Sequence, residues 1–193
     1  MSRFPHGTTG GGGVRRTGNP GPPATRPGGA GPERPQTGDP LAKRWPNYLQ
    51  AGYFDGDGNL KIEYVSRCLP GDEDLPDTDQ HGVERLVLAM AHGDPSLTSG
   101  QLRRFFQHCR GLETRLKSGV ANWPRLRPQF EFLDAAAADA FGKQPPKVPD
   151  VFYHFIRRNV AAVKTEKDFL EGFLPHFEAL VGFASLHLPK DRN

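Results

Sequence analysis

The chain has 193 residues, with 25 lysines and arginines against 22 aspartates and glutamates, a formal net charge of +3. This length suits one domain with a tail, and so small a net charge does not by itself indicate a nucleic-acid partner. Cys68 and Cys109 are the only cysteines, which argues against a disulfide framework and a cysteine zinc site. We expect a cytoplasmic protein without a signal peptide or a membrane-spanning segment.

Residues 1–45 form a low-complexity segment rich in Gly, Pro, Thr and Arg. Because few apolar side chains are available for burial, this tail is predicted to be disordered. Seven basic and two acidic residues between positions 1 and 44 give the tail a net charge of +5. It is interpreted either as a solubilising tail or as an arm that attracts RNA.

Residues 46–80 are expected to form a short extended lead-in and an acidic loop. The glycines and aspartates of residues 55–59 are typical of a turn. Apolar and polar residues alternate from Leu60 to Val65, which favours a short strand or an extended segment. The acidic loop is expected over Gly71–Asp79.

Residues 81–188 are predicted to form a compact bundle of five amphipathic helices, so the fold class is all-α. Caps and helix-breaking residues set the helix limits. The helices are expected from Thr78 or Asp79 to His92, from Thr98 or Ser99 to about Ser118, from Pro124 to Phe141, from Val151 to Lys164, and from Glu166 to about Leu186. Pro175 lies inside the last of them, where we expect a kink or a break.

The core of this bundle follows from the helical period. The phenylalanines of the last two helices are expected to lie inward, and a stacking platform for bases is the alternative. The inward positions are Val83, Leu86, Val87, Met90, Phe152, Phe155, Ile156, Val160, Val163, Phe169, Phe173, Phe177, Leu180, Val181 and Ala184.

Positive charge is concentrated in one part of the chain. Residues 97–128 hold seven basic residues and one acidic residue, a net charge of +6, whereas residues 45–96 hold three and ten, a net charge of −7. The helix predicted from Thr98 to Lys117 places an apolar face opposite a face that is almost purely basic. Because like charges on one face destabilise a helix, a polyanion is the natural partner for it. The candidate binding residues are Arg103, Arg104, Gln107, His108, Arg110, Arg115, Lys117, Arg125 and Arg127.

Two other interpretations of the basic face stay open. It could pair with the acidic segment Asp72–Asp79, or it could dock an acidic protein. Catalytic motifs are missing: none of the seven histidines lies in an HExxH pattern, and neither GxSxG nor a phosphate-binding GK[ST] occurs. We therefore expect no catalytic residues, no metal site and no cofactor, with His108 as an acid or base of a metal-independent ribonuclease as the weaker alternative.

Three motifs in this order resemble the small subunit of type III-A CRISPR–Cas effector complexes, the Csm small subunit. They are Tyr53-Phe54-Asp55 with Gly58-Asn59-Leu60, the helix opening from Leu97 to Phe106, and the segment from Phe177 to Phe183. The resemblance extends over about Tyr53–Ser185. It implies that Gln101, Arg103 and Arg104 contact RNA. The region near Phe132 departs from the family pattern, because the expected tyrosine and arginine are not clear there. Phe132 could replace the tyrosine, and the resemblance does not carry an RNA contact over to Phe132–Ala138.

The resemblance also implies a partner set and a role. Such a subunit is all-helical, is not the nuclease, and stacks in several copies along the guide RNA, where it holds the target RNA in antiviral defence. Its protein partners would be the other Csm subunits, including the large polymerase-like subunit and the repeated backbone subunit. A helical adaptor for an acidic protein and a helix-turn-helix DNA-binding regulator are the alternatives, and no membrane is involved.

Overall fold

A computed structural model of the chain describes residues 39–68 and 82–190. These two stretches are helical and contain no strand, apart from a single antiparallel bridge between Phe54 and Leu60. The predicted all-α class is therefore confirmed. Most of the tail (residues 1–38) and the acidic loop Gly71–Asp79 lie outside the described residues.

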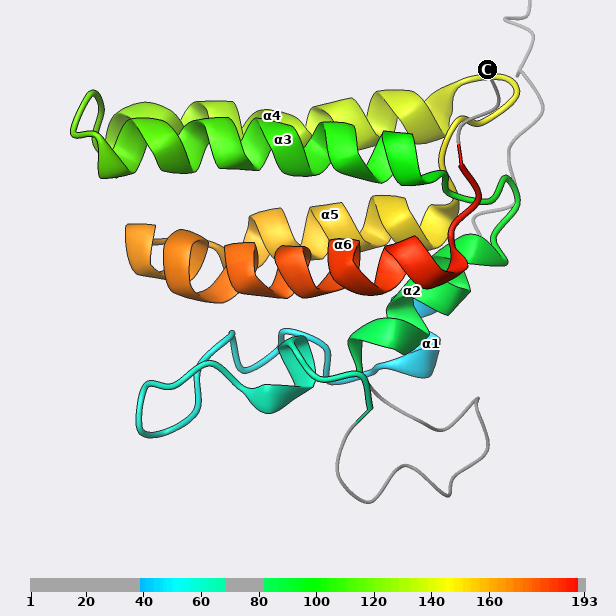
Figure 1. Cartoon of the computed structure of the whole chain (residues 1–193), viewed down its shortest axis with the longest axis horizontal. Helices are drawn as coiled ribbons and strands as arrows, with labels where there is room; N and C mark the ends of the chain where they lie inside the picture. The colour runs from blue at the N-terminus through cyan, green and yellow to red at the C-terminus, as the bar shows by residue number, and fades with distance from the viewer. Residues whose placement is uncertain (1–38, 69–81, 191–193) are drawn as a thin grey trace, which may run out of the picture. The chain divides into compact units, whose positions relative to one another are not determined.

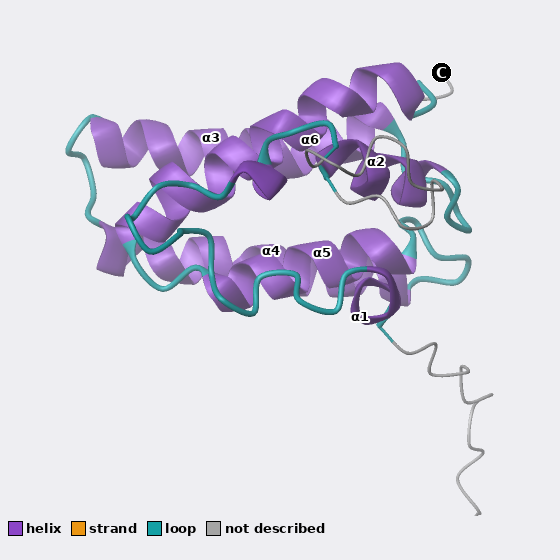
Figure 2. Ribbon diagram, turned by 90° about the horizontal axis from the view of Figure 1, so that it is seen from below, coloured by secondary structure: helices purple, strands orange, loops and turns teal. Residues whose placement is uncertain are grey.

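Four long helical segments form the body of the fold. They are α3 (Ser99–Lys117), α4 (Trp123–Gly142), α5 (Asp150–Ala162) and α6 (Leu174–His187). The helices α3 and α4 lie side by side in one layer and α5 and α6 lie in the next, with α3 packed on α6 and α4 packed on α5 (Figures 1 and 2). The shorter α2 (Val83–Ala91) packs against α6 and α5.

Aromatic side chains fill the space between these layers. Phe130 of α4 contacts Phe169 and Phe173 edge-on, with ring centroids 5.2 Å apart in both pairs. Phe177 continues the row toward Phe155 of α5. Every predicted inward position is buried except Val160 and Val181, which are partly buried. The buried phenylalanines of α5, of α6 and of the π-helix that precedes α6 (Asp168–Phe173) belong to the core and do not form a stacking platform.

The helix α3 begins where the sequence predicts it. Thr98 accepts a hydrogen bond from the Gln101 backbone N–H (3.2 Å), and Gln101 Oε1 accepts one from the Thr98 N–H (2.9 Å). This reciprocal capping box satisfies two backbone groups that would otherwise lack partners. The N-cap predicted at Thr98 or Ser99 is Thr98, and the end predicted near Ser118 is also confirmed.

The start of α2 differs from its prediction. The helix begins at Val83 and not at Thr78 or Asp79, and no side chain caps it. Gly82 precedes it with a φ of +129°, a conformation that residues with a side chain rarely adopt. A Cβ atom there would lie 2.5 Å from the Arg67 carbonyl oxygen, so close packing of the two segments requires glycine.

The expected strand after the turn is instead a short 3₁₀-helix over Ile62–Tyr64. Among the described residues no strand pairs with Ile62–Tyr64, so the backbone hydrogen bonds of this segment close locally, from Tyr64 N to Lys61 O (3.1 Å) and from Val65 N to Ile62 O (3.0 Å). Tyr64 is buried while Ile62 is 62% exposed, whereas strand alternation would have placed both on one face. The predicted turn is present, because Asp55 Oδ1 accepts from two backbone N–H groups within residues 55–59.

The tail predicted to be disordered up to residue 45 is ordered at its end. The helix α1 (Pro40–Arg44) starts with Asp39 as N-cap and proline in its first turn, both of them helix-start signals. Leu41 is fully buried, and Trp45 is 8% exposed. Residues 39–45 are therefore part of the folded domain, because these two apolar side chains find a place in its core.

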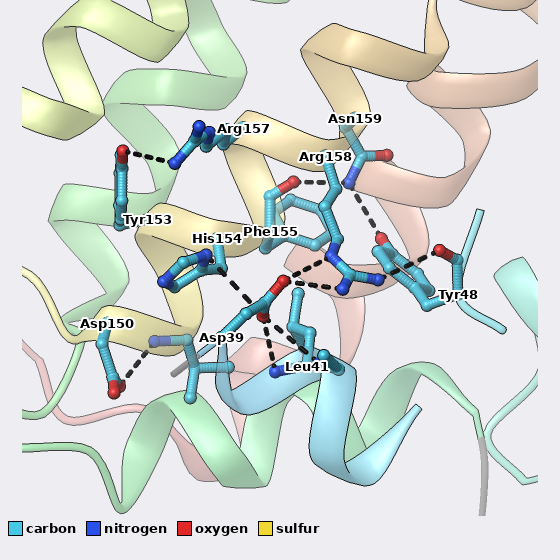
Figure 3. Close-up of polar contacts among 12 residues, drawn as sticks. Asp39, Leu41, Tyr48, Asp150, Tyr153, His154, Phe155, Arg157, Arg158 and Asn159 are labelled. Atoms are coloured by element: carbon cyan, nitrogen blue, oxygen red, sulfur yellow. Dashed lines mark hydrogen bonds and ion pairs between the residues drawn. The ribbon is translucent and has the colours of Figure 1, made fainter. Parts of the chain in front are cut away.

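Asp39 also ties α1 to α5 (Figure 3). Its Oδ2 accepts a hydrogen bond from Arg158 Nε (2.8 Å) and lies 2.6 Å from Arg158 Nη2. Partial burial opposes ionisation of the carboxyl, but Arg158, His154 and the Ala42 N–H together outweigh it and lower the pKa of Asp39.

A buried polar network joins the lead-in to α5 and α6. Tyr53 donates to Asn159 Oδ1 (2.7 Å), and Asn159 Nδ2 donates to the Tyr48 hydroxyl (2.8 Å; Figure 3 shows this second bond). His176 Nδ1 lies 2.6 Å from the Tyr64 carbonyl oxygen, which can only accept, so Nδ1 carries the proton. Nε2 then accepts from the Tyr48 hydroxyl (2.7 Å). The network is self-consistent only with a neutral His176.

This network predicts a pH-dependent stability. Burial lowers the pKa of His176 to about 4 from an ordinary 6.5, so below pH 6.5 the unfolded chain takes up a proton that the folded chain does not bind. The free energy of unfolding should fall by up to about 3 kcal/mol as the pH drops from 6.5 to 4 and should not change through this group above 6.5. Urea unfolding at a series of pH values measures it, with His176→Asn as the variant that should flatten the slope. An equally steep slope in that variant would contradict the assignment.

The last helix is neither split nor interrupted at Pro175. It passes through a π-helix over Asp168–Phe173 and continues as α6, with Pro175 in the first turn. The π-helix ends two residues before Pro175, which lacks an N–H donor, so the disruption expected there takes the form of a π-helical segment. It brings Gly172 against Tyr53, where a Cβ atom would lie 2.6 Å from the ring.

Candidate nucleic-acid interface

The two faces of α3 separate as the helical wheel predicts. Leu102, Cys109, Leu112 and Leu116 are buried, and the two phenylalanines of this helix are partly buried against the core. On the other side every candidate basic residue of α3 is exposed except Arg115, which is half-buried. The apolar face therefore fixes the direction in which the basic side chains point.

Glu113 neutralises part of the basic face. Its two carboxylate oxygens lie 2.7 Å from Arg110 Nη1 and 2.7 Å from Lys117 Nζ. The side chain of Glu113 is only 10% exposed, whereas Arg110 and Lys117 are 50% and 67% exposed. Arg110 and Lys117 thus belong to an ion-pair cluster with a net charge of +1.

Three further candidates already have partners within the fold, two between α3 and α4 and one within α4. Arg115 Nη1 donates to Gln129 Oε1 (2.6 Å), and His108 Nε2 lies 3.0 Å from the Gln129 carbonyl oxygen. Arg127 pairs with Glu131 on the same helix, with Nε and Oε1 2.8 Å apart. The hydrogen-bonding groups of these three side chains are therefore already engaged within the fold, which the sequence alone does not show.

Gln101 also has a structural use. In addition to its part in the capping box, its Nε2 donates to the Lys147 carbonyl oxygen (2.6 Å), which ties the start of α3 to the segment before α5. Both ends of the amide are therefore engaged, so the sequence motif at Gln101 has an explanation in the fold.

Arg103, Arg104 and Arg125 differ from these residues. All three are exposed, and within residues 39–68 and 82–190 none of their side chains forms a hydrogen bond or ion pair. Gln107, on the same face, is likewise exposed. Arg103 and Arg104 stand together near the start of α3, while Arg125 lies in the first turn of α4. Among the candidate residues, Arg103, Arg104 and Arg125 are therefore the cations that remain available to an external anion.

A groove between α3 and α4 was not among the candidate sites. It has a volume of about 300 Å³ and is lined by Arg104, Phe105, His108, Phe132, Leu133 and Ala136. Phe132 is 67% exposed, whereas Phe130, two residues earlier on the same helix, is fully buried. The signal in the sequence is a large aromatic residue on the polar face of α4, about 200° around the helix from Phe130.

Other kinds of site are not seen in the described part of the chain. No group of three or more His, Cys, Asp or Glu residues there could hold a metal ion. None of the helices described is both long and apolar enough to cross a membrane.

The fold and this surface define a small helical-bundle protein with exposed arginines on α3 and in the first turn of α4. The family model described as Csm2 Type III-A matches residues 84–189, more than half of the chain. The chain belongs to this family, the small subunit of the type III-A CRISPR effector called the Csm complex. Comparison with curated proteins and with solved structures gives no match. The match starts inside α2, so the lead-in motif lies outside it.

Proposed function

We propose that this small subunit binds the backbone of the target RNA, or of the guide–target duplex, through the exposed face of α3 and the start of α4. The observation that supports this most is the pair Arg103 and Arg104, exposed and without an ion-pair partner among the residues described. The one carboxylate of α3, Glu113, is already engaged by two other cations. The remaining guanidinium groups suit bidentate contacts to phosphate.

Such contacts position a strand without reading its sequence. Arginine contacts to phosphate oxygens carry no base information, and in an RNA-guided complex base pairing with the guide supplies the sequence. Several copies bound along the guide would each contribute weak contacts, and together these contacts would give a high avidity. The guide and target RNA, further copies of this chain, the large polymerase-like subunit and the repeated backbone subunit are the partners proposed.

The role proposed is non-catalytic. Histidine is the usual acid or base near neutral pH, and His108, whose Nε2 is held by the Gln129 carbonyl, is the histidine of the basic face. Efficient acid–base cleavage needs an acid and a base placed on either side of the reacting phosphate. In the part of the chain described, no second such group lies beside His108 in the groove.

The proposal is tested by measuring binding of the full chain to several unrelated RNAs over a range of salt concentrations. Affinities should agree between sequences and should fall linearly with salt on logarithmic axes, by about 0.7 per phosphate contact on single strands. Affinity that is insensitive to salt would overturn the proposal. A complex with a protein that survives ribonuclease would favour the adaptor alternative instead.

Glu113→Gln is expected to strengthen RNA binding. The substitution keeps the shape of the side chain but releases Arg110 and Lys117 from their ion pairs, so both can reach phosphate. Each additional phosphate that the released cations bind should steepen the salt slope by about 0.7. Asp139→Asn is the matched control, because it removes one charge from a pair on α4 whose carboxylate is 67% exposed and whose cation, Lys143, is not a candidate residue. Weaker binding by Glu113→Gln at unchanged stability would contradict the role of this face.

A further inference from the structure

The α3–α4 groove combines an exposed aromatic ring with positive charge. Among the described residues the large exposed hydrophobic side chains are Ile62, Val120, Phe132 and Leu186, and only Phe132 is aromatic. The other apolar walls of the groove are Phe105, Leu133 and Ala136. Its volume of about 300 Å³ is at the small end of the range for ligand sites.

The polar groups of the groove are Arg104 and His108. Among the described residues no carboxylate lines the groove, and Glu131, next to Phe132 in sequence, is paired with Arg127. Because the Gln129 carbonyl can only accept, His108 Nε2 carries the proton when the ring is neutral. Nδ1 is then a hydrogen-bond acceptor, so the groove offers a cation, an acceptor and an apolar ring face side by side.

We propose that this groove binds an unpaired nucleobase of single-stranded RNA, stacked on Phe132, with the adjoining phosphate on Arg104. His108 Nδ1 accepts a hydrogen bond from a base N–H or from a ribose hydroxyl. The proposal rests on the proposed function and extends it, since phosphate contacts alone need no aromatic ring. Stacking on aromatic side chains tolerates every base, because every base has a π-face.

The chemistry of the groove favours a nucleobase over an apolar peptide. An apolar segment would leave Arg104 and His108 without partners at the contact, whereas a nucleotide satisfies the ring and the cation together. Arg103 is adjacent in sequence and also exposed, so the strand has a second cation available for the next phosphate.

The test compares the full chain with Phe132→Ala, Phe132→Leu and Phe132→Trp. The probes are single-stranded oligouridine, duplex RNA and base-free polyphosphate. Phe132→Ala should weaken binding to oligouridine about tenfold, Phe132→Leu should not rescue it, and Phe132→Trp should. Binding to duplex RNA and to polyphosphate should be unchanged. Leu186→Ala, at a side chain that is 62% exposed and outside the groove, is the control and should bind as the unaltered chain does.

The outcomes separate this proposal from the proposed function. Base stacking would be overturned if Phe132→Ala bound oligouridine as tightly as the unaltered chain. If a variant at Arg103 and Arg104 bound more weakly in the same experiment, backbone binding would stand. Equal losses on all three probes would also overturn it, because polyphosphate has no base. Quenching of the new tryptophan in Phe132→Trp by oligouridine but not by polyphosphate supports stacking, since Trp45 and Trp123 are buried.

Discussion

Replacing Arg103 and Arg104 together by glutamine is expected to weaken binding to single-stranded RNA about twentyfold near 0.1 M salt. Each phosphate contact contributes about 0.7 times the logarithm of the inverse salt concentration, so two contacts contribute about 1.4 logarithmic units. The salt slope should flatten by about 1.4, and the loss should be equal on unrelated sequences. Fluorescence anisotropy at several salt concentrations measures both quantities.

The control for this pair removes the same charge elsewhere. Arg157→Gln with Lys164→Gln takes two exposed cations from α5 and the residue that follows its C-cap, and neither side chain forms an ion pair among the described residues. A general effect of net charge would weaken binding in both double variants, whereas a specific site on α3 affects only the first. Equal losses would therefore contradict the assignment of the site to Arg103 and Arg104.

Gly172→Ala is expected to lower the free energy of unfolding by about 2 kcal/mol, despite the better helix propensity of alanine. The new Cβ atom would lie 2.6 Å from Tyr53 Cγ, and the ring is 1% exposed and held by its hydrogen bond to Asn159. The ring has no free space to move into, so the π-helix or the lead-in must shift. Thermal unfolding should show a Tm lower by about 4–8 °C.

A second glycine of the same continuous helix supplies the control. Gly182 lies in α6, and a Cβ atom there would have nothing within 4 Å. Gly182→Ala should therefore raise stability by about 0.5–1 kcal/mol, because alanine loses less backbone entropy on folding. Destabilisation by both substitutions would show that the helix, and not contact with Tyr53, is responsible.

The five helices could be predicted because their signals are local. Thr98 and Gln101 form a capping box within one turn, and apolar residues recur at the helical period through α3. The lead-in could not be predicted in this way. Its alternation is typical of a strand, but no partner strand is present among the described residues, and the burial of Tyr53 and Tyr64 is decided by Asn159 and His176, more than 100 residues further along the chain.

For the candidate binding residues, too, the sequence predicts one part and the tertiary structure decides the rest. That the cations of α3 share one face follows from their spacing alone. Which of these cations are available does not follow from spacing, because Arg115 is engaged by Gln129 of α4, and Arg110 and Lys117 by Glu113. Of the ten candidate residues, only Arg103, Arg104, Gln107 and Arg125 have side chains without a hydrogen bond or ion pair within the described residues.

The sequence by itself determined the helices, their buried faces and the family, because each depends on patterns within one segment or on motifs in order. The tertiary structure alone decided the course of the lead-in, the π-helix beside Tyr53, the ion pairs of Glu113 and the groove at Phe132. These features arise where segments distant in sequence meet, or where a side chain adopts one of several conformations. Packing and hydrogen-bond partners select among such alternatives, and a local pattern does not contain them.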